Sequence, residues 1–290
     1  MKKTFLFILL AAFAALAFKN DKPAYAIFNK DGKPVKYSKM MKDLETADMV
    51  FYGEMHTDPI SHWLEYNITR DLYKIKKDSL VLGAEMFEAD NQLIMNEYLA
   101  GDYGAKKFEA EIKLWKNYKT DYKPLVEFAK KHNLPFIATD IHRRYASMVY
   151  KKGFDVLDSL SAEAKKYIGP DLVKLYDPEI KCYKDMMNMK DMKDHVDENF
   201  PKAQAAKDAT MAYFILKNWS PGKLFLHYNG SYHSDNFQGI VWWINKLHPG
   251  LNIKTISTVN QEDISRLDEE NLNLADYIVV VPDDMTNTSR

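Results

Sequence analysis

Two segments far apart in this chain have the same form, a glycine followed by two residues and a histidine. They are residues 53–56 (Gly-Glu-Met-His) and 230–233 (Gly-Ser-Tyr-His). Each follows a run of apolar and aromatic residues, 49–52 and 224–228, that predicts a buried strand. Open α/β folds place their ligands at the carboxyl edge of the sheet, where such strands end. The two motifs meet only if their strands share one sheet, so the repetition predicts a site at that edge.

Strands and helices alternate along the rest of the chain. Apolar runs predict further strands at 80–84, 134–139, 253–257 and 277–281, the last of them an edge strand. Periodic apolar residues predict helices at 37–46, 61–76, 91–99, 122–132 and 237–247. In the helix at 61–76, the apolar residues are Trp63, Ile68, Leu72 and Ile75. This alternation favours an α/β fold with a mostly parallel central sheet flanked by helices.

One long segment, residues 159–218, contains no convincing strand. We expect it to form a helical insertion or cap subdomain over the carboxyl edge of the sheet. Residues 18–40, in contrast, are polar and irregular, and we expect no strand there. The insertion includes a methionine-rich stretch, with Met186, Met187, Met189 and Met192. Such residues line an apolar cofactor pocket or fill a helical core.

The composition is that of an ordinary globular protein. The chain has 290 residues, of which 46% are hydrophobic and 28% are charged, and its formal net charge is −1. This length can bury a full core in one large α/β domain. The balanced charge provides no basic surface for nucleic acid, so we expect no nucleic-acid partner. The single cysteine, Cys182, excludes an intramolecular disulfide.

The first residues have the pattern of an export signal. Lys2 and Lys3 precede a short apolar run at 5–13, and small residues follow at 15–17. We therefore expect a signal peptide over 1–17, an α/β domain over 18–290 and export to the periplasm or cell envelope. No cysteine follows the apolar run, so the sequence offers no lipid-anchor site.

The ends of the predicted strands carry polar side chains that suit a metal. Glu54 and His56 end one strand, Glu85 another and His233 a third. Neighbouring parallel strands lie about 4.8 Å apart, so these groups can converge. Two imidazoles and two carboxylates form a credible ligand set for divalent Mn, Co or Zn. The alternative is that they are helix caps and polar loop residues.

Other residues near the strand ends extend this hypothesis. Arg143 and Arg144 follow Asp140 and can orient an anionic substrate or stabilise an oxyanion. Tyr232 is one of several tyrosines that can hold haem iron as a phenolate, although core packing explains most tyrosines. Ser231 lacks the Gly-x-Ser-x-Gly pattern of a serine hydrolase. The sequence also has no glycine-rich dinucleotide or phosphate-binding loop.

A set of motifs extends over about residues 48–257. It consists of 51–56, 83–87 and 98–101, Trp115 with Tyr118 and Tyr122, 134–138, Gln204 with Asp208 and Ala212, and 230–234. Together these motifs resemble a known family, the ChaN-like haem-binding uptake proteins of the Tiki superfamily. Where the family usually has Asn followed by Pro-Arg, this chain has Asp140-Ile141-His142-Arg143.

The resemblance implies an exported or envelope protein with an α/β fold and a small helical subdomain. It implies haem as the ligand and leaves open pairing into homodimers and contact with envelope uptake components. We expect the haem contacts to come from His56, Tyr232, His233, Arg143 and Arg144. The wider superfamily resembles metal-dependent proteases and erythromycin-esterase-like hydrolases, where the positions of Glu54, His56, Glu85 and His233 serve a metal or catalytic role. A metal-dependent hydrolase is therefore the alternative to a haem-binding protein.

Overall fold

The computed structural model describes residues 22–170, 172–187 and 198–288. The expected signal peptide and two of the methionines, Met189 and Met192, lie outside these residues. No helix in the described ranges is both long enough and apolar enough to cross a bilayer.

The strands form a single seven-stranded sheet. They are β1 (Ala26–Asn29), β2 (Met49–Glu54), β3 (Leu80–Glu88), β4 (Phe136–Asp140), β5 (Leu224–Gly230), β6 (Ile253–Gln261) and β7 (Tyr277–Pro282). Their order is β1-β7-β6-β2-β5-β3-β4, and every pair is parallel except β1 with β7. The predicted α/β fold with a mostly parallel sheet is confirmed.

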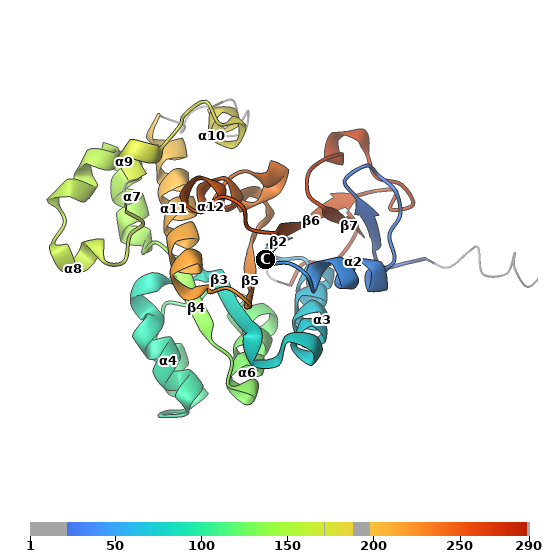
Figure 1. Ribbon diagram of the computed structural model, residues 1–290, viewed down its shortest axis with the longest axis horizontal. Coiled ribbons are helices and arrows are strands. Elements are labelled where there is room, and N and C mark those ends of the chain that lie inside the picture. The colour runs from blue at the N-terminus through green and yellow to red at the C-terminus, as the bar shows by residue number, and fades with distance from the viewer. Residues whose placement is uncertain (1–21, 171, 188–197, 289–290) are drawn as a thin grey trace, which may run out of the picture.

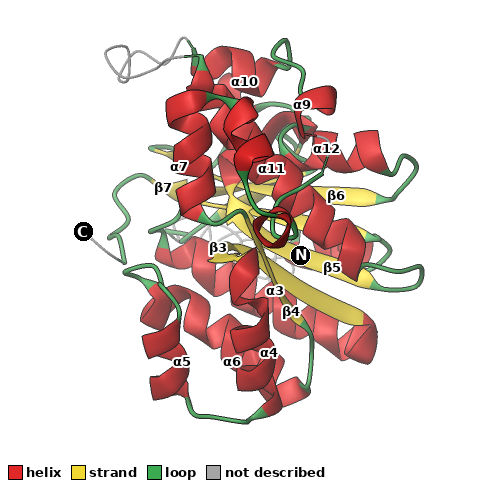
Figure 2. Cartoon of the chain, turned by 90° about the vertical axis from the view of Figure 1, so that its left-hand side faces the viewer, coloured by secondary structure: helices red, strands yellow, loops and turns green. Residues whose placement is uncertain are grey.

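Helices cover both faces of this sheet (Figures 1 and 2). One face carries α2 (Tyr37–Leu44), α3 (Pro59–Lys76), α4 (Gln92–Ala100), α5 (Ala105–Glu111) and α6 (Lys123–His132). The other carries α7 (Arg143–Lys152), α8 (Ala162–Lys165), α9 (Leu172–Leu175), α10 (Lys181–Met186), α11 (Asn199–Asn218) and α12 (Ile240–Leu247). Successive strand residues alternate between the two cores, as Val50 and Phe51 do in β2, because side chains along a strand point to opposite faces.

Two expectations about the strands were wrong. β1 lies within the segment that we expected to be irregular, and it pairs antiparallel with β7. It is therefore β1, and not β7, that forms this edge of the sheet. A strand of only four residues between turn residues carries too little periodicity to be recognised in the sequence.

The buried face of α3 also differs from the prediction. Trp63 and Ile75, expected on its apolar side, are 52% and 54% exposed. The buried stripe instead runs through Ser61, Glu65, Ile68 and Leu72. An acidic residue, Glu65, therefore lies in the interior of the helix–sheet interface, where apolar residues are the norm.

The register of the strands places the two glycine–histidine motifs side by side. β2 and β5 are neighbours, and Gly53 pairs with Asn229 while Glu54 pairs with Gly230. On the other side of β5, Ala84 of β3 pairs with Tyr228. Glu85 therefore lies one residue beyond that pair, level with Asn229 and Gly53, where the two motifs begin.

The close packing of β2 against the second motif yields a test. A methyl group on Gly53 would lie 2.9 Å from Ser231 Cα and 3.0 Å from the carbonyl oxygen of Ile256, both backbone atoms. We expect Gly53→Ala to lower the free energy of unfolding by about 1–3 kcal/mol, measured by urea denaturation. The control, Gly104→Ala, has open space around the new methyl group. Equal stability of the two variants would contradict this packing.

Candidate functional site

A cavity of about 330 Å³ opens at the carboxyl edge of β2 and β5. Both glycine–histidine motifs line it, and the predicted helical insertion supplies part of its wall through α10 and α11. The described lining residues are Glu54, Met55, His56, Met186, Phe200, Gln204, Gly230, Ser231, Tyr232 and His233.

His56 is oriented by a buried carboxylate. Its Nδ1 lies 2.8 Å from Glu54 Oε1, and the Tyr122 hydroxyl donates to the same oxygen at 2.6 Å. The ring packs edge-on against Trp115, with 4.8 Å between ring centroids. Its other nitrogen, Nε2, has no hydrogen-bond partner within the described part of the chain, and the side chain is 42% exposed. Nε2 is thus the atom of His56 that remains available to a ligand.

His233 is held between two carboxylates. Its Nδ1 lies 2.5 Å from Asp208 Oδ1, and its Nε2 lies 3.3 Å from Glu85 Oε1. The Tyr183 hydroxyl donates to the second oxygen of Asp208 at 2.7 Å. Burial disfavours a charged imidazole, but the two carboxylates outweigh burial and raise the pKa of His233 to about 10. The two carboxylates therefore favour the charged form of His233, with one on each ring nitrogen.

Glu85 connects the two motifs. Its Oε2 accepts a hydrogen bond from the backbone N–H of Gly230 at 2.8 Å, while its Oε1 faces His233. Burial opposes its charge, yet His233 more than compensates and keeps the pKa of Glu85 well below its usual value. A methyl group on Gly230 would lie 2.8 Å from His56 Nε2 and 3.6 Å from Glu85 Oε2. The absence of a side chain at Gly230 thus lets both groups approach the same point.

The four residues expected to hold a metal, Glu54, His56, Glu85 and His233, lie at the same edge of the sheet, but no three of them have ligand atoms within 4.8 Å of one another. They form two pairs instead, Glu54 with His56 and Glu85 with His233. Two groups in the described ranges do have their ligand atoms within 4.8 Å of one another. They are Glu54 with His62 and Glu65, and Glu88 with Asp90 and His142.

A lysine completes the charges around Glu85. Lys207 Nζ lies 3.6 Å from Glu85 Oε1 and 3.7 Å from Asp140 Oδ2. Burial raises the pKa of Asp140 to about 7, although Lys207 opposes that shift. The sequence analysis did not identify Lys207, and Asp208 entered only through the family resemblance. The sequence feature that could have identified both residues is their position as a charged pair in the middle of an alanine-rich helix.

Of the other three residues expected to contact haem, one lines the cavity and two are not among its described lining residues. Tyr232 lines the cavity, and its hydroxyl donates to the carbonyl oxygen of Cys182 at 2.6 Å. Arg143 and Arg144 are not among the described lining residues. They pair with Glu88 and Asp90 at the end of β3 instead.

Comparison with known proteins identifies the family of the chain. The family described as "Haem-binding uptake, Tiki superfamily, ChaN" matches residues 40–244. The chain belongs to the ChaN family. It is similar to a solved structure of ChaN from Campylobacter jejuni described as showing cofacial haem binding, with a TM-score of 0.63 and 19% identity, over 89% of this chain and 96% of that one.

The chain is less similar to two other solved structures. A succinoglycan biosynthesis protein has a TM-score of 0.49 and 12% identity, over 87% of this chain and 94% of its own. A mutant of the erythromycin esterase EreC has a TM-score of 0.45 and 12% identity, over 90% of this chain and 83% of its own. No curated protein sequence matches this chain. The family membership confirms the resemblance found in the sequence, and the Campylobacter structure confirms the fold.

The charge state of His233 can be measured directly. We expect its imidazole to stay protonated until about pH 10, and Asp208→Asn to lower that pKa by about 1–3 units because one of the two facing carboxylates is lost. Titration of the ring resonances by NMR checks both values, and His233→Gln assigns the signal. Because the pKa of His233 is raised in the folded state, its protonation contributes to the free energy of unfolding. This contribution has its full size below pH 6.5 and is lost as the pH rises to about 10.

The matched control for this experiment is Asp263→Asn, which removes an exposed carboxylate that faces Arg266 and not His233. It should leave the titration of His233 unchanged. A wild-type His233 that titrates near pH 6.5 would contradict the ion-pair network.

Proposed function

We propose that this protein captures haem in the cavity between the two glycine–histidine motifs, as an exported component of iron acquisition. The family to which the chain belongs supports haem as the ligand. The observation that carries the proposal is the arrangement of His56. One ring nitrogen is fixed by a buried carboxylate, and the other is left without a partner beside the cavity.

The residues of the cavity suit a haem group. Met55, Met186 and Phe200 offer apolar surface for the flat macrocycle, and imidazole is a common axial ligand of haem iron. A histidine ligand generally has its second nitrogen bonded to a carboxylate or carbonyl, which sets the tautomer and makes the free nitrogen more basic. Glu54 does this for His56. When bound, haem would supply an iron centre, and His56 Nε2 would hold it.

His56 is a better candidate for the iron ligand than Tyr232. A tyrosine binds iron as a phenolate, and burial raises the pKa of Tyr232 well above its ordinary value. Its hydroxyl is also engaged with the carbonyl of Cys182. We propose that Tyr232 and His233 contribute to the wall of the haem site. Arg143 and Arg144 remain candidates for the haem carboxylates, since their side chains are 41% and 50% exposed.

The size of the cavity has a consequence for assembly. At about 330 Å³ it lies at the lower end of the range for ligand pockets, so a haem seated there would keep one face exposed. We propose that a second copy of the chain covers this face. The similar Campylobacter protein is described as binding haem cofacially, which supports this arrangement. Export to the periplasm or cell envelope, with transfer to uptake components there, follows from the same proposal.

Hemin titration of the purified protein tests the proposal. We expect saturable binding with a shifted Soret band, and at least a tenfold loss of affinity together with a changed spectrum in His56→Ala, because the axial nitrogen is removed. The control is His248→Ala, which removes an exposed imidazole that follows α12, away from the cavity. Absence of saturable binding to the wild type, or an unchanged spectrum in His56→Ala, would refute the proposal.

A second candidate function rests on the convergence of Glu54, His56, Glu85 and His233. With a bound Mn, Co or Zn ion, such a set would activate water for hydrolysis. The four residues form two separate pairs, Glu54 with His56 and Glu85 with His233, and no three of them have ligand atoms within 4.8 Å of one another. This separation makes the hydrolase the weaker of the two candidates.

The metal content of the purified protein, measured by elemental analysis, distinguishes the hydrolase from the haem-binding protein. A metal-dependent hydrolase would carry about one Mn, Co or Zn per chain, would lose it in both His56→Ala and His233→Ala, and would hydrolyse ester or peptide substrates. We expect these two variants to retain the metal content of the wild type. A stoichiometric ion that both variants lose, together with hydrolytic activity, would favour the hydrolase.

A further inference from the structure

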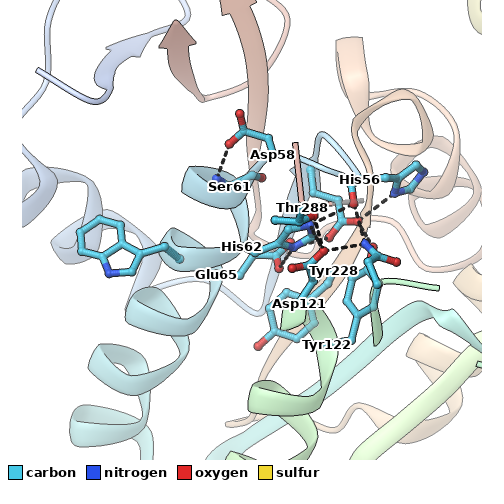
Figure 3. A network of polar contacts seen from close by, with 12 residues as sticks. His56, Asp58, Ser61, His62, Glu65, Asp121, Tyr122, Tyr228 and Thr288 are labelled. Atoms are coloured by element: carbon cyan, nitrogen blue, oxygen red, sulfur yellow. Dashed lines mark hydrogen bonds and ion pairs between the residues drawn. The ribbon is translucent and has the colours of Figure 1, made fainter. Parts of the chain in front are cut away.

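A second polar cluster lies behind His56, on the side of the sheet covered by α3. It is formed by Glu54 at the end of β2, by His62 and Glu65 of α3, and by Asp121 and Tyr122 in a short π-helical segment, η4 (Tyr118–Tyr122). Figure 3 shows the side chains of His62, Glu65 and Asp121 pointing toward one another. All five residues are buried, and none of them except Glu54 lines the haem cavity among the described residues.

The two ring nitrogens of His62 face different groups. Its Nε2 lies 3.1 Å from the backbone carbonyl oxygen of His56 and 3.4 Å from Asp121 Oδ2. A carbonyl only accepts, so the proton of a neutral ring is on Nε2. The lone pair is then on Nδ1, which lies 3.1 Å from Glu65 Oε2 and 3.6 Å from Glu54 Oε2.

The two glutamates in this cluster have oxygens without hydrogen bonds. Glu54 Oε2 and Glu65 Oε1 have no donor within the described part of the chain, and both side chains are 0% exposed. No lysine or arginine of the described ranges forms an ion pair with either of them. Asp121 differs, because the Asn117 amide and the Thr288 hydroxyl each donate to its Oδ2 at 2.7 Å.

In this cluster three carboxylates surround a single imidazole, that of His62. Burying an ionised carboxylate without a partner is strongly unfavourable, so the site must take up either protons or a cation. Burial raises the pKa values of Glu54 and Glu65 to about 8, and each carboxylate lies close enough to affect the other. In contrast, Glu85 on the other side of β5 has both a lysine and an imidazolium beside it.

We propose that Glu54, His62 and Glu65 bind one divalent transition-metal ion, Zn²⁺ or Mn²⁺, in the interior of the protein. Their ligand atoms lie within 4.8 Å of one another, and one imidazole nitrogen with two carboxylate oxygens is a donor set that suits these ions. Asp121 and the carbonyl of His56 accept from the second nitrogen of His62, as the partners of metal-bound histidines generally do.

The metal would act on the cavity through Glu54 and the backbone of His56. Glu54 shares its two oxygens between His56 and this cluster, so an ion there fixes the carboxylate that orients His56. The site itself does not depend on haem binding. Its role is structural, because the described residues leave His62 and Glu65 little contact with solvent.

Metal titration of the full chain, treated with EDTA and dialysed, tests this site. Zn²⁺ and Mn²⁺ are titrated separately by calorimetry, and the bound ion is counted by elemental analysis. We expect one ion per chain with Kd in or below the micromolar range, a higher Tm with metal, and at least a hundredfold weaker binding in Glu65→Gln. His62→Gln repeats the test if Glu65→Gln does not fold, as judged by circular dichroism.

Two variants serve as controls. His142→Gln alters the more exposed group of Glu88, Asp90 and His142, and His233→Gln alters the carboxyl edge. Both should keep the bound ion and the rise in Tm. The proposal is overturned if the wild type binds neither ion more tightly than millimolar, since the two glutamates then share a proton. Loss of the ion in either control, with retention in Glu65→Gln, also overturns it.

Discussion

The parallel pairing of β2 with β5 is the constraint on which the rest of the site depends. It sets Gly53 opposite Asn229 and Glu54 opposite Gly230, and so brings two motifs nearly the whole domain apart to one edge. Glu85 secures the junction, because one of its oxygens accepts from the Gly230 amide and the other faces His233. Gly230 has no side chain, which allows the ring of His56 to lie directly over it.

The two sides of this junction differ in their balance of charge. Around Glu85, His233 and Lys207 face three carboxylates, those of Glu85, Asp208 and Asp140, and offset most of their charge. Only Asp140 Oδ1 lacks a hydrogen-bond partner among these carboxylates in the described part of the chain. Around Glu54 and Glu65 the carboxylates outnumber the positive groups, and two oxygens have no donor. The first side therefore provides a rigid wall, whereas the second requires protons or a cation. His56 stands between them, and its unpaired Nε2 is the group that we assign to haem.

Much of the fold and part of the site could be predicted from the sequence. Buried parallel strands are continuous apolar runs, so 49–52, 80–84 and 224–228 were recognisable, and the polar residues that follow them had to lie at the carboxyl edge. The spacing of Glu54 and His56 also indicated that their side chains face the same way, as their 2.8 Å contact shows.

The remainder depended on tertiary contacts. The prediction assigned Trp63 and Ile75 to the buried face of α3 and left Glu65 out of it. A search for apolar periodicity cannot recognise a buried position that is occupied by an acidic residue. The position of Arg143 and Arg144 after β4 was visible in the sequence, but their pairing with carboxylates of β3 and the turn after it was not. Ion pairing between distant segments leaves no periodic signal in the sequence.

Anomalous diffraction at the iron absorption edge, from crystals of the hemin complex, tests the meeting of the two motifs most directly. The account predicts an iron peak within coordination distance of His56 Nε2, beside Gly230. An iron atom bound by another residue, with the ring of His56 turned away from Gly230, would contradict it.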